Sequence, residues 1–168
     1  MSPEREDPPV EGDERTMLVG WLDFHRDTLA LKTAGLSPGD FARRPVVGSA
    51  LSLLGLVRHL TEIERTYFRR VFAGEDLPDL AFGEDPFGET PGGDFDACAA
   101  HPPEEALAAW QAEVDVARSI IRGTPSLDDP RQSGLPLRFW LVKTLNEYAR
   151  HNGHADIVRE LLDGTTGE

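Results

Sequence analysis

Apolar side chains recur at steps of three and four residues in four segments of the chain, which is the period of an amphipathic α-helix. The segments run from about residue 13 to 34, 49 to 74, 102 to 123 and 136 to 163. No segment shows the strict alternation of apolar and polar positions that is typical of a half-buried strand. The pattern therefore predicts an all-α fold. Four such helices favour a four-helix bundle, and an irregular all-α domain is the alternative.

Turn and capping residues mark the ends of these segments. Ser37 directly precedes Pro38, which predicts one short additional helical turn after the first helix. Either Ser49 or Ser52 can cap the start of the second long helix. Glycine is common just past the end of a helix, and each predicted helix is followed by one: Gly35, Gly74, Gly123 and Gly164.

The remainder of the chain divides into an acidic tail and one long loop. Residues 1–12 carry three prolines and several acids, a composition that predicts a disordered tail. Residues 13–168 then make up a single domain. Between the second and third long helices, residues 74–100 are rich in glycine, proline and acidic residues and show no periodicity, so we expect a long loop there.

The charge of the chain excludes several classes of function. Lys and Arg total 17 and Asp and Glu total 30, giving a net charge of −13. This argues against binding to nucleic acid and to an anionic membrane surface. No apolar run approaches the roughly 20 residues of a membrane span, and the N-terminus lacks the pattern of a signal peptide. With the single cysteine, Cys98, no internal disulfide forms, and we expect a cytoplasmic location.

Polar residues interrupt the apolar face of the fourth long helix. Glu147, His151 and His154 fall within an arc of about 60° on a helix of 3.6 residues per turn. The second long helix offers a matching group, because His59 lies among the apolar positions Leu56, Leu60 and Ile63. Burying such groups is costly unless they are paired or bind a metal.

These four residues predict a site for a divalent metal ion. Three protein ligands leave one position of a zinc ion open for water or substrate, which is typical of a catalytic site. The simpler alternatives are a hydrogen-bonded core histidine at position 59 and a surface hydrogen bond between Glu147 and His151. Glycine-rich phosphate-binding motifs, a nucleophile elbow and paired cysteines are absent from the sequence. We expect Trp21, Trp140 and Tyr148 to line a cavity at the site.

Three stretches resemble the DinB-like superfamily, and within it the actinobacterial branch related to mycothiol-dependent enzymes. They are LDFHRDTLALKTAGLS, SLLGLVRHLTEIERTYF and NEYARHNGHADIVRELLDG, and the resemblance covers roughly residues 13–164. It implies a four-helix bundle that holds a divalent metal through His59 and through Glu147 and His151. His154 falls where many relatives carry glutamine, so the third ligand is either Glu147 or His154.

The resemblance also implies a reaction. Family members include thiol S-transferases and a maleylpyruvate isomerase that use mycothiol or bacillithiol. Our first hypothesis is a metal-dependent S-transferase or isomerase in which the metal holds a mycothiol-type thiolate that attacks a small electrophile. Zinc is the first choice of metal, and nickel, iron and manganese are alternatives. The reactive sulfur then comes from the cofactor and not from Cys98.

Two further hypotheses use the same residues differently. One is a metal-dependent hydrolase with the same site. The other is a non-catalytic helical protein whose role is binding or dimerisation. The expected partners are a small-molecule thiol and an electrophilic substrate, and the family resemblance implies a homodimer.

Overall fold

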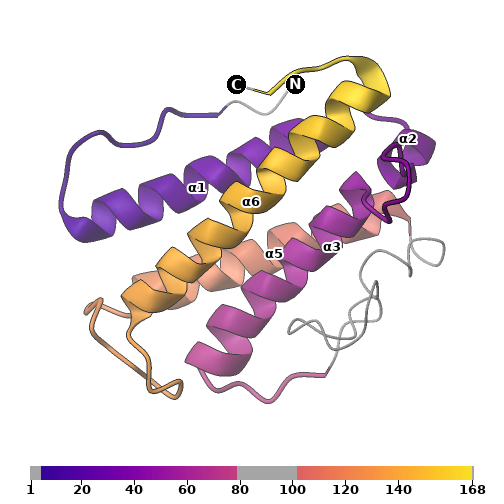
Figure 1. Ribbon diagram of the computed structural model, residues 1–168. Helices are drawn as coiled ribbons and strands as arrows, with labels where there is room; N and C mark the ends of the chain where they lie inside the picture. Colours follow the sequence, from indigo (N-terminus) through magenta and orange to yellow (C-terminus); the bar gives the residue numbers. More distant parts are fainter. Residues whose placement is uncertain (1–4, 79–101, 168) are drawn as a thin grey trace.

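The computed structural model describes residues 5–78 and 102–167, and within these ranges all regular structure is helical (Figure 1). The prediction of an all-α fold is confirmed. None of the described helices has both the length and the apolar character that crossing a membrane requires. Most of the predicted loop lies outside the described residues. The elements in chain order are α1 (Glu14–Thr33), α2 (Pro38–Ala42), α3 (Leu53–Glu64), η1 (Arg65–Phe72), α5 (Pro103–Arg122) and α6 (Leu137–Asp163).

Local capping explains where the helices begin and end. The Asp13 side chain accepts a hydrogen bond from the Thr16 backbone N–H at the start of α1, and Ser37 caps the short helix α2 in the same way. Ser52, and not Ser49, caps α3. Gly164 ends α6 with a left-handed backbone at φ 78°, a conformation that glycine adopts without strain.

The long helices pack around one interior. Helix α6 lies against α1 and α3, and α3 also lies against α5, which runs behind them in Figure 1. The interior is filled mainly by leucine and aromatic side chains. Its fully buried members include Leu22, Leu29, Leu53, Leu56, Leu60, Phe68, Phe72 and Tyr148.

The second long helix differs from its prediction in one respect. The sequence predicts a continuous α-helix, but after Glu64 the chain continues as a π-helix, with wider turns closed by bonds such as Ala73 N–H to the Phe68 carbonyl at 3.0 Å. Apolar periodicity does not reveal this change. The wide segment is held against α5, because Arg65 and Arg69 both donate to Glu113, at 2.7 and 3.0 Å.

Residues 5–12 carry no regular secondary structure and run along α1 (Figure 1). The Arg5 guanidinium lies 4.5 Å from the centre of the Phe24 ring and donates to the Thr28 hydroxyl at 3.2 Å. Further along, Pro9 lies so close to Gly20 that a Cβ there would come within 2.5 Å of the proline ring. The absence of a side chain at Gly20 therefore lets the segment approach the helix.

Candidate metal centre

His59 of α3 meets Glu147 and His151 of α6 at the contact between the two helices. The ligand atoms of the three side chains all lie within 4.8 Å of one another. Glu147 Oε2 is 3.5 Å from His151 Nε2 and 3.9 Å from His59 Nε2. The structure thus brings together three of the four residues that the sequence singles out.

Local geometry accounts for this arrangement. Glu147 and His151 are four residues apart on one helix and so lie on the same face. Across the helix contact, the His59 and His151 rings meet edge to face with centroids 4.5 Å apart. The three side chains are 14–19% exposed, so they lie at the edge of the interior rather than in its centre. The side chains at this position are therefore only partly shielded from solvent.

The surroundings give both α6 residues the protonation state of a metal ligand. The pKa of Glu147 is lowered, first by the polar interaction with the nearby His59 imidazole and then by the charges of His59, His151 and Lys143, against the opposing effect of burial. The pKa of His151 is lowered to about 4, chiefly by burial and next by the charge of His59. At neutral pH the site therefore presents a carboxylate and a neutral imidazole, the forms that bind metal ions.

The donor set and its spacing fit a divalent metal ion. Zinc with ligands at about 2.0–2.2 Å in tetrahedral geometry requires donor atoms about 3.3–3.6 Å apart. The observed 3.5 and 3.9 Å separations come close to this, so a small side-chain movement would close the site. Two imidazoles and one carboxylate suit zinc, and also iron or nickel. Three ligands leave a coordination position open.

His154 lies beside this centre and outside the three-residue cluster. Its Nδ1 is 3.3 Å from His151 Nδ1, a hydrogen bond in which one of the two nitrogens carries the proton. That contact uses the His151 nitrogen opposite to Nε2, the atom that faces Glu147. A hydrogen bond on the far nitrogen is the usual way in which a protein orients a metal-binding histidine.

Sequence reasoning missed a fourth contact of the centre. The Tyr67 hydroxyl donates to Glu147 Oε1 at 3.4 Å. Tyr67 occupies an apolar position of the second long helix, where a core side chain is expected, and it is indeed only 3% exposed. The pKa of Tyr67 is raised, first by burial and then by the charge of Glu147, so the hydroxyl keeps its proton. The one sequence feature that could have indicated this contact is the presence of a tyrosine two turns after His59 on the same helix.

Comparison with known proteins supplies the family. The family model described as Mycothiol-S-transferase matches residues 17–164. The chain belongs to this family. The resemblance to DinB-like proteins related to mycothiol enzymes is thereby confirmed. Comparisons with curated proteins and with solved structures give no match.

One aromatic residue of this Mycothiol-S-transferase family member, Tyr148, is placed differently from what we expected. Tyr148 is fully buried, and its hydroxyl accepts from Trp110 Nε1 at 2.8 Å and donates to Glu64 at 2.9 Å. It therefore faces the interior and not a cavity at the metal centre, since it lies about 100° around α6 from Glu147. Trp140 packs on Tyr67, and Trp21 lies on α1. Cys98 lies outside the described residues.

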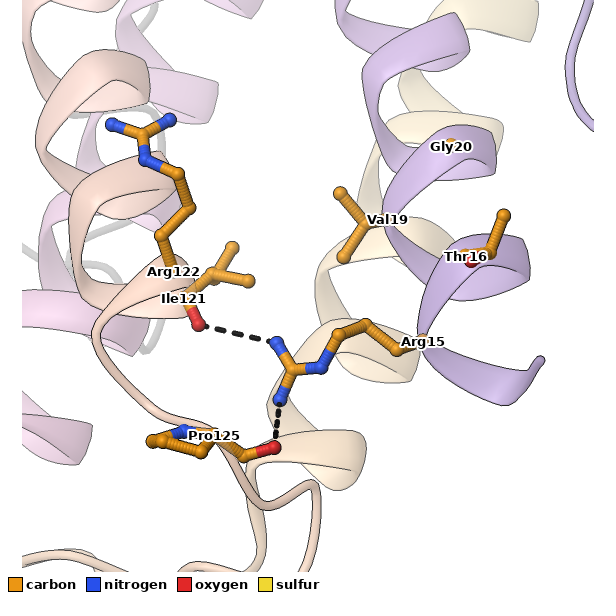
Figure 2. A pocket seen from close by; sticks show the side chains of 7 residues that line it. All are labelled: Arg15, Thr16, Val19, Gly20, Ile121, Arg122 and Pro125. Carbon is orange, nitrogen blue, oxygen red and sulfur yellow. Dashed lines mark hydrogen bonds between the residues drawn. The ribbon is translucent and has the colours of Figure 1, made fainter. Parts of the chain in front are cut away.

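A separate groove opens between the start of α1 and the end of α5. It has a volume of about 620 Å³ (Figure 2). Arg15 crosses it and donates to the carbonyls of Ile121, Thr124 and Pro125 at 3.2, 2.6 and 2.9 Å. None of the lining residues belongs to the three-residue cluster, so this groove is distinct from the metal centre. The lining residues are Arg15, Thr16, Val19, Gly20, Ile121, Arg122 and Pro125.

Proposed function

We propose that this member of the Mycothiol-S-transferase family is a metal-dependent S-transferase that uses a low-molecular-weight thiol of the mycothiol type. The observation that carries the proposal is the cluster of His59, Glu147 and His151 in a chain of this family. In this proposal the long helices form a four-helix bundle of the DinB-like type. The metal is zinc, with nickel, iron and manganese as alternatives.

The chain's residues would act by binding and orienting. His59 Nε2, His151 Nε2 and Glu147 Oε2 would hold the ion. A bound divalent ion lowers the pKa of a coordinated thiol, so that the sulfur is a thiolate near neutral pH. Two neutral imidazoles and one carboxylate leave a divalent ion with a single net positive charge, which favours an anionic sulfur ligand at the open position.

The overall reaction is a substitution at an electrophilic carbon. A bond forms between the thiol sulfur and that carbon, and the bond to the leaving group breaks, with the leaving group taking the bonding electron pair. The thiol proton passes to solvent. An isomerase would use the same first bond, since the thiol adds to an unsaturated substrate and is released again after rotation.

The test combines metal analysis with a thiol-conjugation assay. Purified protein is expected to contain about one equivalent of metal and to accelerate the reaction of mycothiol with monochlorobimane. His59→Ala and His151→Ala are expected to reduce that rate to the uncatalysed one. His25→Gln serves as the control, because His25 lies outside the three-residue cluster and glutamine keeps a polar side chain where His25 Nδ1 lies 3.4 Å from Asn152 Nδ2.

Other outcomes would favour the other hypotheses. Ester hydrolysis without thiol, lost in His59→Ala, would indicate a metal-dependent hydrolase. Protein without stoichiometric metal, and with no effect of either histidine substitution, would indicate a non-catalytic binding or dimerisation protein. Either result would overturn the proposal of thiol transfer.

The proposal also includes a cytoplasmic location and a homodimer. Exposed apolar side chains on α6 support the dimer, because large apolar groups in water favour association. Light scattering on the purified protein measures the oligomeric state. The side chains are Phe139, Val142, Ile157 and Leu161, with exposed fractions of 42–53%.

A further inference from the structure

The two carboxylate oxygens of Glu147 face different partners. Oε2 is directed to the imidazoles, 3.5 Å from His151 Nε2 and 3.9 Å from His59 Nε2. Oε1 accepts the hydrogen bond of the Tyr67 hydroxyl at 3.4 Å. One oxygen of the carboxylate therefore contacts the tyrosine, and the other faces the two histidines.

The π-helix explains how Tyr67 comes to this place. Tyr67 follows His59 by eight residues, which on a regular α-helix would rotate it about 80° away from His59 around the helix axis. The chain is π-helical from Arg65 onward, and each residue of a wider turn rotates less. The residues after Glu64 are thus turned back toward the side on which His59 lies. π-Helical segments are often found at functional sites.

The Tyr67 ring is held firmly. It is 3% exposed, and it packs against Trp140 with ring centroids 5.4 Å apart. Lys143 Nζ lies 4.9 Å from the ring centre, on the face of the aromatic system. A ring held on two sides presents its hydroxyl in one direction, so the contact with Oε1 depends on the fold and not on a mobile side chain.

We propose that Tyr67 is a positioning residue that makes Glu147 bind the metal through a single oxygen, Oε2. This inference rests on the metal centre of the proposed function. If both oxygens bound, Glu147 would occupy two coordination positions. With Oε1 held by Tyr67, one more position stays open for the thiol and its substrate. Tyr67 itself touches neither metal nor substrate.

The test compares the wild type with Tyr67→Phe, which keeps the ring and removes only the hydroxyl. Zinc affinity is measured by competition with a chromophoric chelator, and coordination is followed by the visible spectrum of the cobalt(II) form. We expect zinc affinity to fall about tenfold, the usual effect of removing a group that orients a metal ligand. We expect the cobalt absorption to weaken as coordination rises when Glu147 binds through both oxygens. The melting temperature of the metal-free protein should not change.

Tyr148→Phe is the matched control. It removes a buried hydroxyl next to Glu147 in sequence, but one that is bonded to Glu64 and Trp110 in the interior. We expect the opposite pattern, a lower melting temperature with zinc affinity and cobalt spectrum unchanged.

Three results would overturn the inference. Tyr67→Phe with wild-type affinity and spectrum would show that the hydroxyl does not orient Glu147. An equal loss of affinity in Tyr148→Phe would show a general effect of packing. In both cases the proposed function would still stand if the wild type binds metal and His59→Ala does not. Wild-type protein that binds no metal would overturn the proposed function and this inference together.

Discussion

Arg26 and Glu64 form an ion pair in the interior of the protein, with Arg26 Nε and Nη2 each 2.8 Å from a different Glu64 oxygen. Both side chains are 0% exposed. The pair is extended by the Tyr148 hydroxyl, which donates to Glu64, and by Trp110, which donates to Tyr148. These residues come from α1, α3, α6 and α5, so one polar network joins all the long helices. Hydrogen-bonded networks of this kind select one packing of helices over alternatives only when every member is satisfied.

Glu64→Gln is expected to destabilise the protein by about 3–5 kcal/mol, since it leaves the Arg26 charge buried without a counter-charge. Urea unfolding of the metal-free protein measures this effect. Glu14→Gln is the matched control, because Glu14 accepts the same two-bond contact from Arg138 at 2.8 and 2.9 Å. That pair is exposed, and solvent screens it, so stability should change little. Equal effects of the two substitutions would contradict the importance of burial.

Zinc is expected to raise the melting temperature of the wild type. An ion that binds only the folded state at a hundred times its Kd stabilises by about 2.7 kcal/mol. Thermal unfolding in EDTA and in excess zinc gives the shift directly. His59→Ala should show no shift, whereas His25→Gln should behave as the wild type. A full shift in His59→Ala would place the binding site elsewhere.

Glu147→Gln and His154→Gln distinguish the two candidates for the third ligand. Glu147 Oε2 faces both imidazoles, whereas His154 contacts only the outer nitrogen of His151. We therefore expect Glu147→Gln to remove measurable zinc binding. His154→Gln should weaken it by about tenfold, as for loss of an orienting group. Isothermal titration of the two variants decides between them, and the reverse order of effects would make His154 the ligand.

Asp163 is expected to titrate near pH 2 in the folded protein. Its pKa is lowered to about 2, first by the hydrogen bond from Arg159 and then by those from Thr165. Because the folded pKa lies below the unfolded value of about 3.9, the stabilising effect is complete above about pH 5 and is lost as the pH falls through the folded pKa near 2. NMR titration of the carboxyl carbon measures it. In Arg159→Gln the pKa should return toward 3.9, and an unchanged value would contradict the assigned cause.

Gly153→Ala is expected to stabilise the protein by about 0.5–1 kcal/mol. Gly153 is exposed in the middle of α6, and a Cβ there would meet no atom within 4 Å. Alanine has the higher helix propensity and would introduce no clash within the chain. The free energy of unfolding in urea is measured at protein concentrations below and above the one at which the protein dimerises. Destabilisation seen only in an associated form would show that a second molecule approaches this position.

Two of the three residues of the metal centre, Glu147 and His151, could be placed together from local spacing alone. Glu147 and His151 are four residues apart, and this alone places them on one face of any α-helix. His59 was predicted from its position in an apolar stripe, but its meeting with Glu147 depends on how α3 and α6 are rotated about their axes. Tyr67 escaped prediction because the change from α- to π-helix has no clear mark in the sequence.

Charged residues in the interior were the least predictable feature. Arg26 and Glu64 each stand in an amphipathic segment where a charge is typical of the solvent side. They are 38 residues apart, and only the packing of α1 against its neighbours brings them together. A buried charge is favourable only when its partner is present, and no local pattern shows that partner.

The sequence by itself determined where the long helices lie, the short helical turn after Ser37 and the pairing of Glu147 with His151, because all three depend on interactions within a few residues. The tertiary structure alone decided that His59 reaches this pair, that Tyr67 holds the second oxygen of Glu147, and that Arg26 is neutralised inside the protein. Each of these joins side chains far apart in the chain. The distances between these side chains depend on how the packed helices are rotated and spaced. The period of apolar residues gives the rotation of a helix about its axis only to within tens of degrees.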